Sequence, residues 1–328
     1  MRVKTNMTLA RRLLVFAVGL VAGTVWSYDL YWGGGSSDIA DGTPLPVTTN
    51  GLSGTWNATL RNWAVSPKPG VYTTYLDGAF VQLGAYTNNG PGVNASVTVE
   101  SGRTFSGIAA CLNATTDYNR MFDLTAASPV TLTPAAGGAV VNLVSQDSTR
   151  GMRLMPNVAL TGTAPLEKIG VGIIEIQSDS SAYTGALTVR FGTLAVSASG
   201  SLKGVKAING VGQVVTPTAT SYGGNEFGMG AFRVTAAGGA NDKLADDATL
   251  TLKRGSFDYR PAANSVETMG RVDVETWGVI GGSSGTAGGV LTLGDAAAGL
   301  TRGSIGRGMI MVPVGTSGNN LLNIRVPN

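Results

Sequence analysis

Apolar and polar positions alternate in short runs along most of this chain, and the stretch from Leu166 to Gly200 shows the pattern most clearly. Three runs there have an apolar residue at nearly every second position: Gly172–Gln177, Ala186–Arg190 and Thr193–Ser197. A period of two is typical of a strand buried on one face. The Ser, Asp and Gly residues between the runs favour turns, because Gly accepts positive φ and Asp or Ser can bond the local backbone. The stretch therefore predicts three strands and no helix, as in one unit of a solenoid.

Similar runs continue on both sides of this stretch and predict an all-β chain without a strong domain boundary. Turns rich in Gly, Pro or Ser separate these runs. The clearest runs are Val93–Val99, Ala139–Val144, Ala248–Lys253, Arg271–Glu275 and Val290–Leu293. The composition agrees, since 48 glycines, 43% hydrophobic residues and only 13% charged residues favour many short strands over Glu- and Lys-rich helices. At roughly 20 to 25 residues per coil, we expect a solenoid of about 12 to 15 coils.

The order of residues within Leu166 to Gly200 also matches a known kind of repeat. Its elements are Leu166, Lys168, Gly170 and Gly172, then Tyr183-Thr184-Gly185, Leu187-Thr188-Val189 and Gly192-Thr193-Leu194. This order resembles the autotransporter-associated β-strand repeat, found in passenger domains of large bacterial surface proteins. The resemblance implies a right-handed parallel β-helix that is secreted, displayed outside the cell and used as a stalk or adhesive surface. Ala182, Ala186 and Phe191 depart from the repeat, which has Asn, Gly and Gly there.

Three of the five tryptophans lie in the segment 28–92, namely Trp32, Trp56 and Trp63. Their surroundings, Tyr31-Trp32, Gly54-Thr55-Trp56 and Asn62-Trp63, also resemble the segment that opens such passenger domains. Bulky aromatic rings could cover the open core and the strand edge at the first coil of a solenoid. Alternatively, the same three rings could stack on a carbohydrate. We expect an aromatic-rich N-terminal cap over 28–92 and a β-solenoid of diverged repeats over 93–328, of which 166–200 is the best preserved.

Residues 1–27 carry the pattern of a secretory signal peptide. An apolar run over 13–25 follows four basic residues, Arg2, Lys4, Arg11 and Arg12. The run is shorter than the roughly 20 residues of a membrane-spanning helix, and we expect cleavage near Ser27. Removal of the segment lowers the 23 basic residues to 19, against 20 acidic ones, for a net charge of −1. We therefore expect a secreted protein with no nucleic-acid partner and no transmembrane segment in the mature chain, and the resemblance to autotransporter passengers implies display at the cell surface, associated with the outer membrane.

The residue types exclude several kinds of catalytic site. The chain has no histidine, which removes Ser-His-Asp and Cys-His hydrolases, histidine general bases and histidine-bound zinc. Its single cysteine, Cys111, allows no intramolecular disulfide and is expected to be a small buried residue. The sequence contains no P-loop, dinucleotide-binding or calcium-loop motif, so we expect no cofactor and no metal.

An acidic pair on one predicted strand offers the remaining route to an enzyme. In a strand, Asp273 and Glu275 point to the same face as Arg271. Two carboxylates beside an arginine could serve a β-helix polysaccharide lyase or glycoside hydrolase. A solvated strand face with one surface ion pair is the simpler interpretation.

The sequence therefore favours a secreted or surface-displayed, non-enzymatic β-solenoid with a structural or adhesive role. Self-association or contact with cell-surface glycans is the expected partnership, and a β-helix lyase or hydrolase and a carbohydrate-binding module remain the alternatives. Lys168, Glu175 and Tyr183 are expected to be turn and surface residues of the scaffold. The last residues lack the amphipathic strands of an autotransporter translocator, which predicts either a longer parent protein or another export route.

Overall fold

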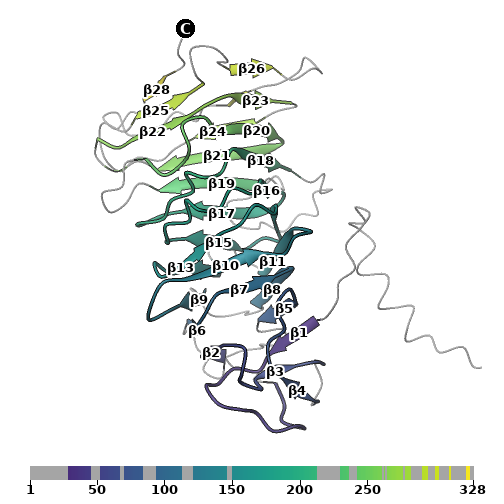
Figure 1. Cartoon of the computed structure of the whole chain (residues 1–328). Helices are drawn as coiled ribbons and strands as arrows, with labels where there is room; N and C mark the ends of the chain where they lie inside the picture. Colours follow the sequence, from purple (N-terminus) through teal and green to yellow (C-terminus); the bar gives the residue numbers. More distant parts are fainter. Residues whose placement is uncertain are drawn as a thin grey trace, which may run out of the picture.

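The structure is a computed structural model. It describes residues 29–45, 52–66, 70–83, 94–112, 121–145, 150–212, 230–235, 242–260, 262, 264–275, 278–281, 290–294, 300–302, 310–311 and 323–325. Within these residues the chain forms β-strands and no α-helix, which confirms the predicted all-β class. The strands form layers that follow the chain from β5 to β28, with β1 to β4 gathered at the N-terminal end of the stack (Figure 1). The predicted signal peptide lies outside the described residues.

The longest sheet, called sheet A here, has twelve strands. In spatial order these are β26 (Leu300–Arg302), β23 (Val272–Val274), β20 (Thr249–Lys253), β18 (Ala207–Val211), β16 (Leu187–Val189), β14 (Leu166–Ile169), β11 (Ala139–Ser145), β8 (Gly107–Leu112), β5 (Phe80–Leu83), β1 (Asp29–Trp32), β3 (Trp63–Ala64) and β4 (Tyr72–Thr73). Neighbouring strands are parallel from β26 to β1. Only the last two pairs, β1 with β3 and β3 with β4, are antiparallel.

A second parallel sheet, sheet B, has ten strands. In spatial order these are β2 (Gly54–Trp56), β6 (Ala95–Val99), β9 (Met121–Thr125), β12 (Gly151–Leu154), β15 (Ile173–Ile176), β17 (Gly192–Val196), β19 (Gly230–Thr235), β21 (Gly255–Arg260), β24 (Gly278–Gly281) and β27 (Ile310–Met311). The strands of sheets A and B alternate along the chain for most of its length. The chain therefore winds from one sheet to the other and back once per coil.

A third face completes the coils at both ends of the stack. One three-stranded sheet contains β7 (Arg103–Phe105), β10 (Val130–Pro134) and β13 (Val158–Leu160), and the other contains β22 (Val266–Met269), β25 (Val290–Leu293) and β28 (Asn323–Arg325). Between these two sheets, consecutive coils are joined by isolated parallel bridges such as Gly162 with Tyr183 and Leu202 with Leu244. Three faces that are all built from parallel strands of successive coils make this a β-solenoid, as predicted.

Consecutive coils stay in register although their lengths differ. Lys168 of β14 pairs with Val189 of β16, and Val189 pairs with Gly210 of β18, so these two coils are equally long. The coil from Gly210 to its partner Leu252 in β20 is twice as long, and the coil from Leu252 to Val274 is short again. Strand pairing therefore sets the position of each coil, whatever the length of its connections.

The prediction that Leu166–Gly200 forms one solenoid unit is wrong in its extent. The stretch holds four strands, β14 to β17, two from each of the sheets A and B. The additional strand is β14, in which Glu167 and Lys168 hide the alternation of apolar and polar residues. The coil that begins at Lys168 is already complete at its partner Val189, well before Gly200, so the stretch covers more than one coil.

Inward side chains form one apolar core that runs along the axis of the stack. In sheet B, for example, Leu194, Phe232, Phe257 and Ile280 occupy the same register position in four successive coils, and all four are buried. The rings of Phe232 and Phe257 stack at 6.0 Å with an interplanar angle of 15°. Full burial of such a side chain contributes roughly 1.5 to 3 kcal/mol. Each coil therefore depends on the coils above and below it for burial.

Glycine is required at the corner that leads from sheet A to sheet B. Gly170 and Gly192 have φ values of 78° and 69°, in the left-handed region. A Cβ atom on Gly192 would collide with the carbonyl oxygen of Gly170 in the neighbouring coil. Gly192 therefore provides the positive φ at this corner, directly after Phe191.

Candidate functional site

The three tryptophans proposed for carbohydrate contact lie together at the N-terminal end of the stack. Trp63 lies 4.8 Å from Trp32, 5.3 Å from Trp56 and 5.4 Å from Tyr75, measured between ring centroids. The indole nitrogen of Trp32 donates to the Leu52 carbonyl at 2.6 Å. Trp32 is 2% exposed, and Trp56 and Trp63 are fully buried. The rings therefore pack against each other, and none of them presents a face to a sugar in solvent.

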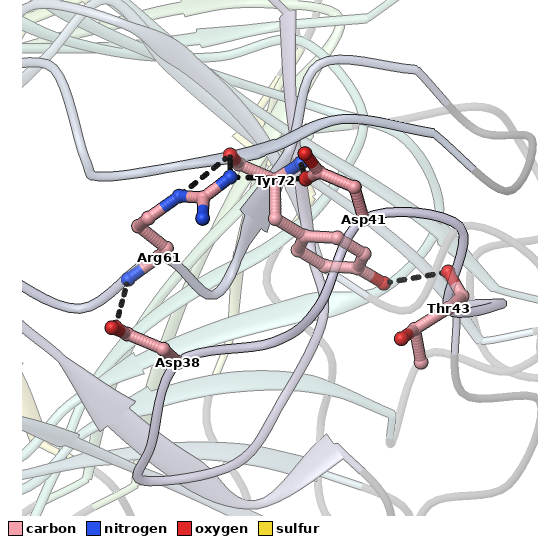
Figure 2. A network of polar contacts seen from close by, with 5 residues as sticks. All are labelled: Asp38, Asp41, Thr43, Arg61 and Tyr72. Atoms are coloured by element: carbon pink, nitrogen blue, oxygen red, sulfur yellow. Dashed lines mark hydrogen bonds and ion pairs between the residues drawn. The ribbon is translucent and has the colours of Figure 1, made fainter.

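A polar network surrounds β4 at the same end of the molecule (Figure 2). The Arg61 guanidinium donates to the Tyr72 carbonyl from Nε at 3.2 Å and from Nη2 at 2.9 Å. Asp41 Oδ1 accepts from Arg61 Nη2 at 3.0 Å and from the Tyr72 backbone N–H at 2.9 Å. The Arg61 backbone N–H donates to Asp38 at 2.8 Å, and the Tyr72 hydroxyl donates to the Thr43 carbonyl at 3.3 Å. Charged side chains thus satisfy both backbone groups of Tyr72.

The acidic pair of the enzyme alternative lies on sheet A, and each carboxylate has its own cation. Asp273 accepts from Arg271 Nε at 2.7 Å, and Glu275 pairs with Lys253 of the neighbouring coil at 3.0 Å. The Glu275, Lys253 and Arg271 side chains are about half exposed. Two carboxylates that are both held by cations on an open strand face match the solvated-face interpretation better than a catalytic acid and base.

Ion pairs between consecutive coils occur on all three faces of the stack. They join Asp123 to Arg153 (2.6 Å), Arg233 to Asp258 (2.8 Å), Lys253 to Glu275 (3.0 Å), Lys203 to Asp242 (2.6 Å), Glu167 to Arg190 and Lys206 to Asp247. Sequence reasoning missed these pairs. The sequence does carry a signal for these pairs, because the two partners are separated by the length of one coil. That length is evident only once the pairing of strands in successive coils is known.

The most buried of these pairs lies on the outer face of sheet B. Arg153 stands in register between Asp123 and Glu175, and its Nε and Nη2 atoms bond the two Asp123 carboxylate oxygens at 2.6 and 2.8 Å. The hydrogen bond to Asp123 raises the pKa of Arg153. Glu175, which lies on the outer surface as predicted, accepts a hydrogen bond from the Ser197 hydroxyl of the next coil. Two-point contact between a guanidinium and a carboxylate fixes the relative position of the strands.

Lys168 lies inside the core, so the prediction that it is a turn or surface residue is wrong. Its side chain is fully buried, because Lys168 shares the inward face of β14 with Leu166. The ammonium group donates to the carbonyls of Ile169 at 2.8 Å, Gly170 at 2.7 Å and, in the next coil, Phe191 at 3.2 Å. Burial lowers the pKa of Lys168 to about 7. Three carbonyl acceptors match the three donors of an ammonium group, and they tie two successive corners together.

The prediction for Tyr183 is also wrong. Tyr183 is fully buried, and its hydroxyl donates to the Ala164 carbonyl at 2.8 Å. Its backbone forms a parallel bridge with Gly162 on the third face. Burial raises the pKa of Tyr183. Like Lys168, it is an inward residue with a polar end that satisfies a backbone carbonyl.

A second buried polar group lies at the corner that follows sheet B. Lys243 Nζ donates to the carbonyls of Ala198 at 2.5 Å and Gly200 at 3.1 Å in the preceding coil. Glu267, from the following coil, accepts from the backbone N–H groups of Lys243 and Leu244, both at 3.0 Å. Burial lowers the pKa of Lys243 and raises that of Glu267 to about 8. These side chains again bond the backbone of the neighbouring coil.

Several remaining predictions concern binding and membrane contact. Among the described residues, no group of three or more Cys, Asp or Glu side chains is arranged to hold a metal ion. No helix long and apolar enough to cross a membrane is found in the same part of the chain. Cys111 lies in β8, where its Cα pairs with that of Val144, but its side chain lies outside the described part.

Comparisons of the chain with protein-family models, with curated proteins and with solved structures gave no match.

Proposed function

We propose that this chain is a structural or adhesive β-solenoid module that is exported and displayed at the cell surface or released from it. The observation that carries the proposal is the use of charged side chains between coils. Salt bridges link neighbouring coils on each face, and buried Lys168 and Lys243 bond the corners of neighbouring coils. A protein that uses its ionisable groups in coil-to-coil contacts is suited to a rigid surface scaffold.

Features of the sequence support the location and the finer architecture in this proposal. The basic and apolar residues of 1–27 favour export, and the resemblance of 166–200 to autotransporter-associated repeats favours surface display and a right-handed winding. The segment 28–92 acts as an N-terminal cap, since its buried aromatic cluster lies at the end of the described stack, where β3 and β4 end sheet A.

The enzyme alternative has less support from the same residues. A lyase or glycosidase needs carboxylates that can exchange protons with a bound sugar. Asp273 and Glu275 are instead engaged by Arg271 and Lys253 on an open strand face. The carbohydrate-binding alternative would need an exposed aromatic ring, and Trp32, Trp56 and Trp63 are buried.

Export and display can be tested by expressing the full chain in a Gram-negative host. Mass spectrometry of the cell surface and of the medium should find the chain there, with a mature N-terminus near Tyr28. Beads coated with the purified chain should bind each other or glycan-bearing surfaces, whereas beads coated with heat-unfolded chain should not. Retention of the full-length, uncleaved chain in the cytoplasm would contradict the proposal.

A second measurement separates the scaffold from the enzyme. Purified wild-type chain is incubated with polygalacturonate and other polysaccharides, and the release of reducing or unsaturated ends is followed. We expect no turnover above that of the solvent blank. Depolymerisation that is lost in Asp273→Ala, but kept in the control Asp258→Ala, would favour the lyase or hydrolase.

A further inference from the structure

The outer edge of β4 is the end of sheet A at the N-terminal side of the stack. In the pair of β3 with β4, Ala64 is opposite Tyr72, and the Val65 N–H donates to the Val71 carbonyl at 3.1 Å. Hydrogen-bonded and non-bonded pairs alternate in an antiparallel ladder, so Tyr72 belongs to a non-bonded pair. Its N–H and C=O therefore point away from β3. Outward backbone groups of this kind are the groups that pair with an added strand.

Two side chains occupy these groups in place of a strand (Figure 2). Asp41 accepts from the Tyr72 N–H at 2.9 Å, and Arg61 donates to the Tyr72 C=O at 2.9 and 3.2 Å. Asp41 and Arg61 are themselves paired at 3.0 Å. Together they provide one acceptor and one donor, which is what a residue of a neighbouring strand would provide. We call Asp41 and Arg61 the edge clamp.

The backbone around the edge clamp holds it in place. The Arg61 N–H donates to Asp38 at 2.8 Å, and the Arg61 carbonyl accepts from the Ile39 N–H at 2.9 Å. On the β4 side, the Gly42 N–H donates to the Gly70 carbonyl at 3.0 Å. Residues 38–43 therefore run from Arg61 to β4 and bring the Asp41 side chain to its edge.

Exposed apolar side chains lie on β4's flanks in the chain and on the residue paired with one of them. Of the four large hydrophobic residues that are exposed in the described part of the chain, three belong to this region: Val65, Val71 and Leu76, at 50%, 56% and 51%. A strand edge flanked by exposed valines favours association of β-strands. The edge clamp thus lies in the region that carries three of the four exposed large hydrophobic side chains of the described residues.

We propose that Asp41 and Arg61 close the β4 edge against strand addition, and that loss of the clamp allows β4 of a second copy to pair there. A second copy is the partner that the geometry favours, because two identical edges can pair antiparallel about a twofold axis. Such pairing would use the Tyr72 N–H and C=O of both copies and would bury Val71 on each. The proposal does not depend on whether the protein is a scaffold or an enzyme.

The test compares the full-length, secreted chain with the double variant Asp41→Ala/Arg61→Ala. Sedimentation velocity over a hundredfold concentration range should show a dimer that is at least tenfold more populated in the variant. Hydrogen exchange should show that the Tyr72 amide is protected in wild type, exposed in the dilute variant and protected again at high concentration. Adding Val71→Lys to the double variant should abolish the dimer, because the two introduced charges would meet at the interface.

Two controls keep the result specific. Lys253→Ala/Glu275→Ala removes an ion pair of similar exposure from the coils and should leave the sedimentation unchanged. Tryptophan emission reports whether the N-terminal core stays folded. If the double variant unfolds there, Arg61→Met, which keeps the side-chain stem, should still raise the dimer fraction.

The proposal fails if a folded double variant or a folded Arg61→Met stays monomeric at the highest concentration. It also fails if association persists after Val71→Lys, or if the Lys253 and Glu275 control associates to the same extent, because the contact would then lie elsewhere.

Discussion

In the central coils, β14 to β18, each strand is bonded on both edges by the equivalent strand of a neighbouring coil, whereas β4 at the N-terminal end has, among the described strands, a neighbour on one edge only. The central coils bury columns of aliphatic side chains together with Lys168, and the ammonium group of Lys168 bonds a carbonyl of the next coil. The N-terminal end buries clustered tryptophans, and side chains from its own segment bond the outer edge. A repeated coil thus obtains burial and hydrogen bonds from its neighbours, and the end of the stack must provide both from nearby sequence.

The largest expected effect tests whether the two regions are independent. Trp63→Ala removes a fully buried ring from the aromatic cluster and should cost about 3 to 5 kcal/mol locally. Because a coil contacts only its neighbours, hydrogen exchange should rise in residues 29–83 and stay unchanged in 166–212. Trp63→Phe, which keeps an aromatic ring, is the control and should lose much less stability and hydrogen-exchange protection. Equal loss of protection in both regions would show that the end is required for the whole stack.

A pH experiment sharpens the picture of the central coils. The pKa of Lys168 is about 7 in the folded chain and 10.5 as its ordinary value, so the unfolded chain binds more protons between these pH values. Stability should therefore rise with pH in this window and should be lowest below pH 7. The wild type should gain up to about 1.4 kcal/mol per pH unit relative to Lys168→Met. Denaturant unfolding at pH 7.5, 8.5 and 9.5 measures the difference. The stability difference between wild type and the exposed-lysine control Lys253→Met should not change with pH in this way. An equal pH trend for both variants would refute the assignment of the lowered pKa to Lys168.

A smaller effect is expected at the outer face of sheet B. Arg153→Gln leaves the half-buried Asp123 carboxylate without its two guanidinium bonds and should cost about 1 to 2 kcal/mol. The loss of these bonds should lower the protection of β9 and β12 against hydrogen exchange. The protection of the N-terminal end should not change. Arg153→Lys, which can make only a single-point contact, should recover part of the stability. A change in the free energy of unfolding below the error of the measurement would mean that the pair does not stabilise the register of these strands.

The smallest effect is expected on the exposed face of sheet A. Lys253 and Glu275 are about half exposed, so Lys253→Gln should change the free energy of unfolding by ~0.5 kcal/mol or less. The same denaturant series as for Arg153→Gln measures it, and raising the salt concentration should remove the difference. A cost as large as that of Arg153→Gln would show that exposure does not decide the strength of these pairs.

The fold was predictable because inward residues are mostly apolar at every second position. The predicted run Val290–Leu293 matches strand β25 in both bounds and alternation, whereas the run Thr193–Ser197 matches the position of β17, all of whose residues are buried. Lys168 was missed although its register gives it the same face as Leu166, because a charged residue in a short run indicates a turn or a surface. Its burial requires three carbonyls that only the corners of two coils bring together.

The ion pairs and the edge clamp were not predictable for a different reason. Lys206 and Asp247 are separated by a much longer piece of chain than Glu167 and Arg190, so no fixed spacing identifies both pairs. The edge clamp joins Asp41 to Arg61 through an irregular segment without strand periodicity. Contacts of this kind depend on loop lengths and on side-chain direction, which the pattern of apolar residues does not contain.

The unequal coil lengths have a consequence for how a gene of this type can change. Between Gly210 and Leu252 the chain uses twice as many residues as between Lys168 and Val189, yet both pairs are in register. Codons gained or lost in a connection between strands can therefore leave the hydrogen-bonded frame of the next coil intact. New surface properties can be acquired by lengthening a single connection, and the stack itself need not be redesigned.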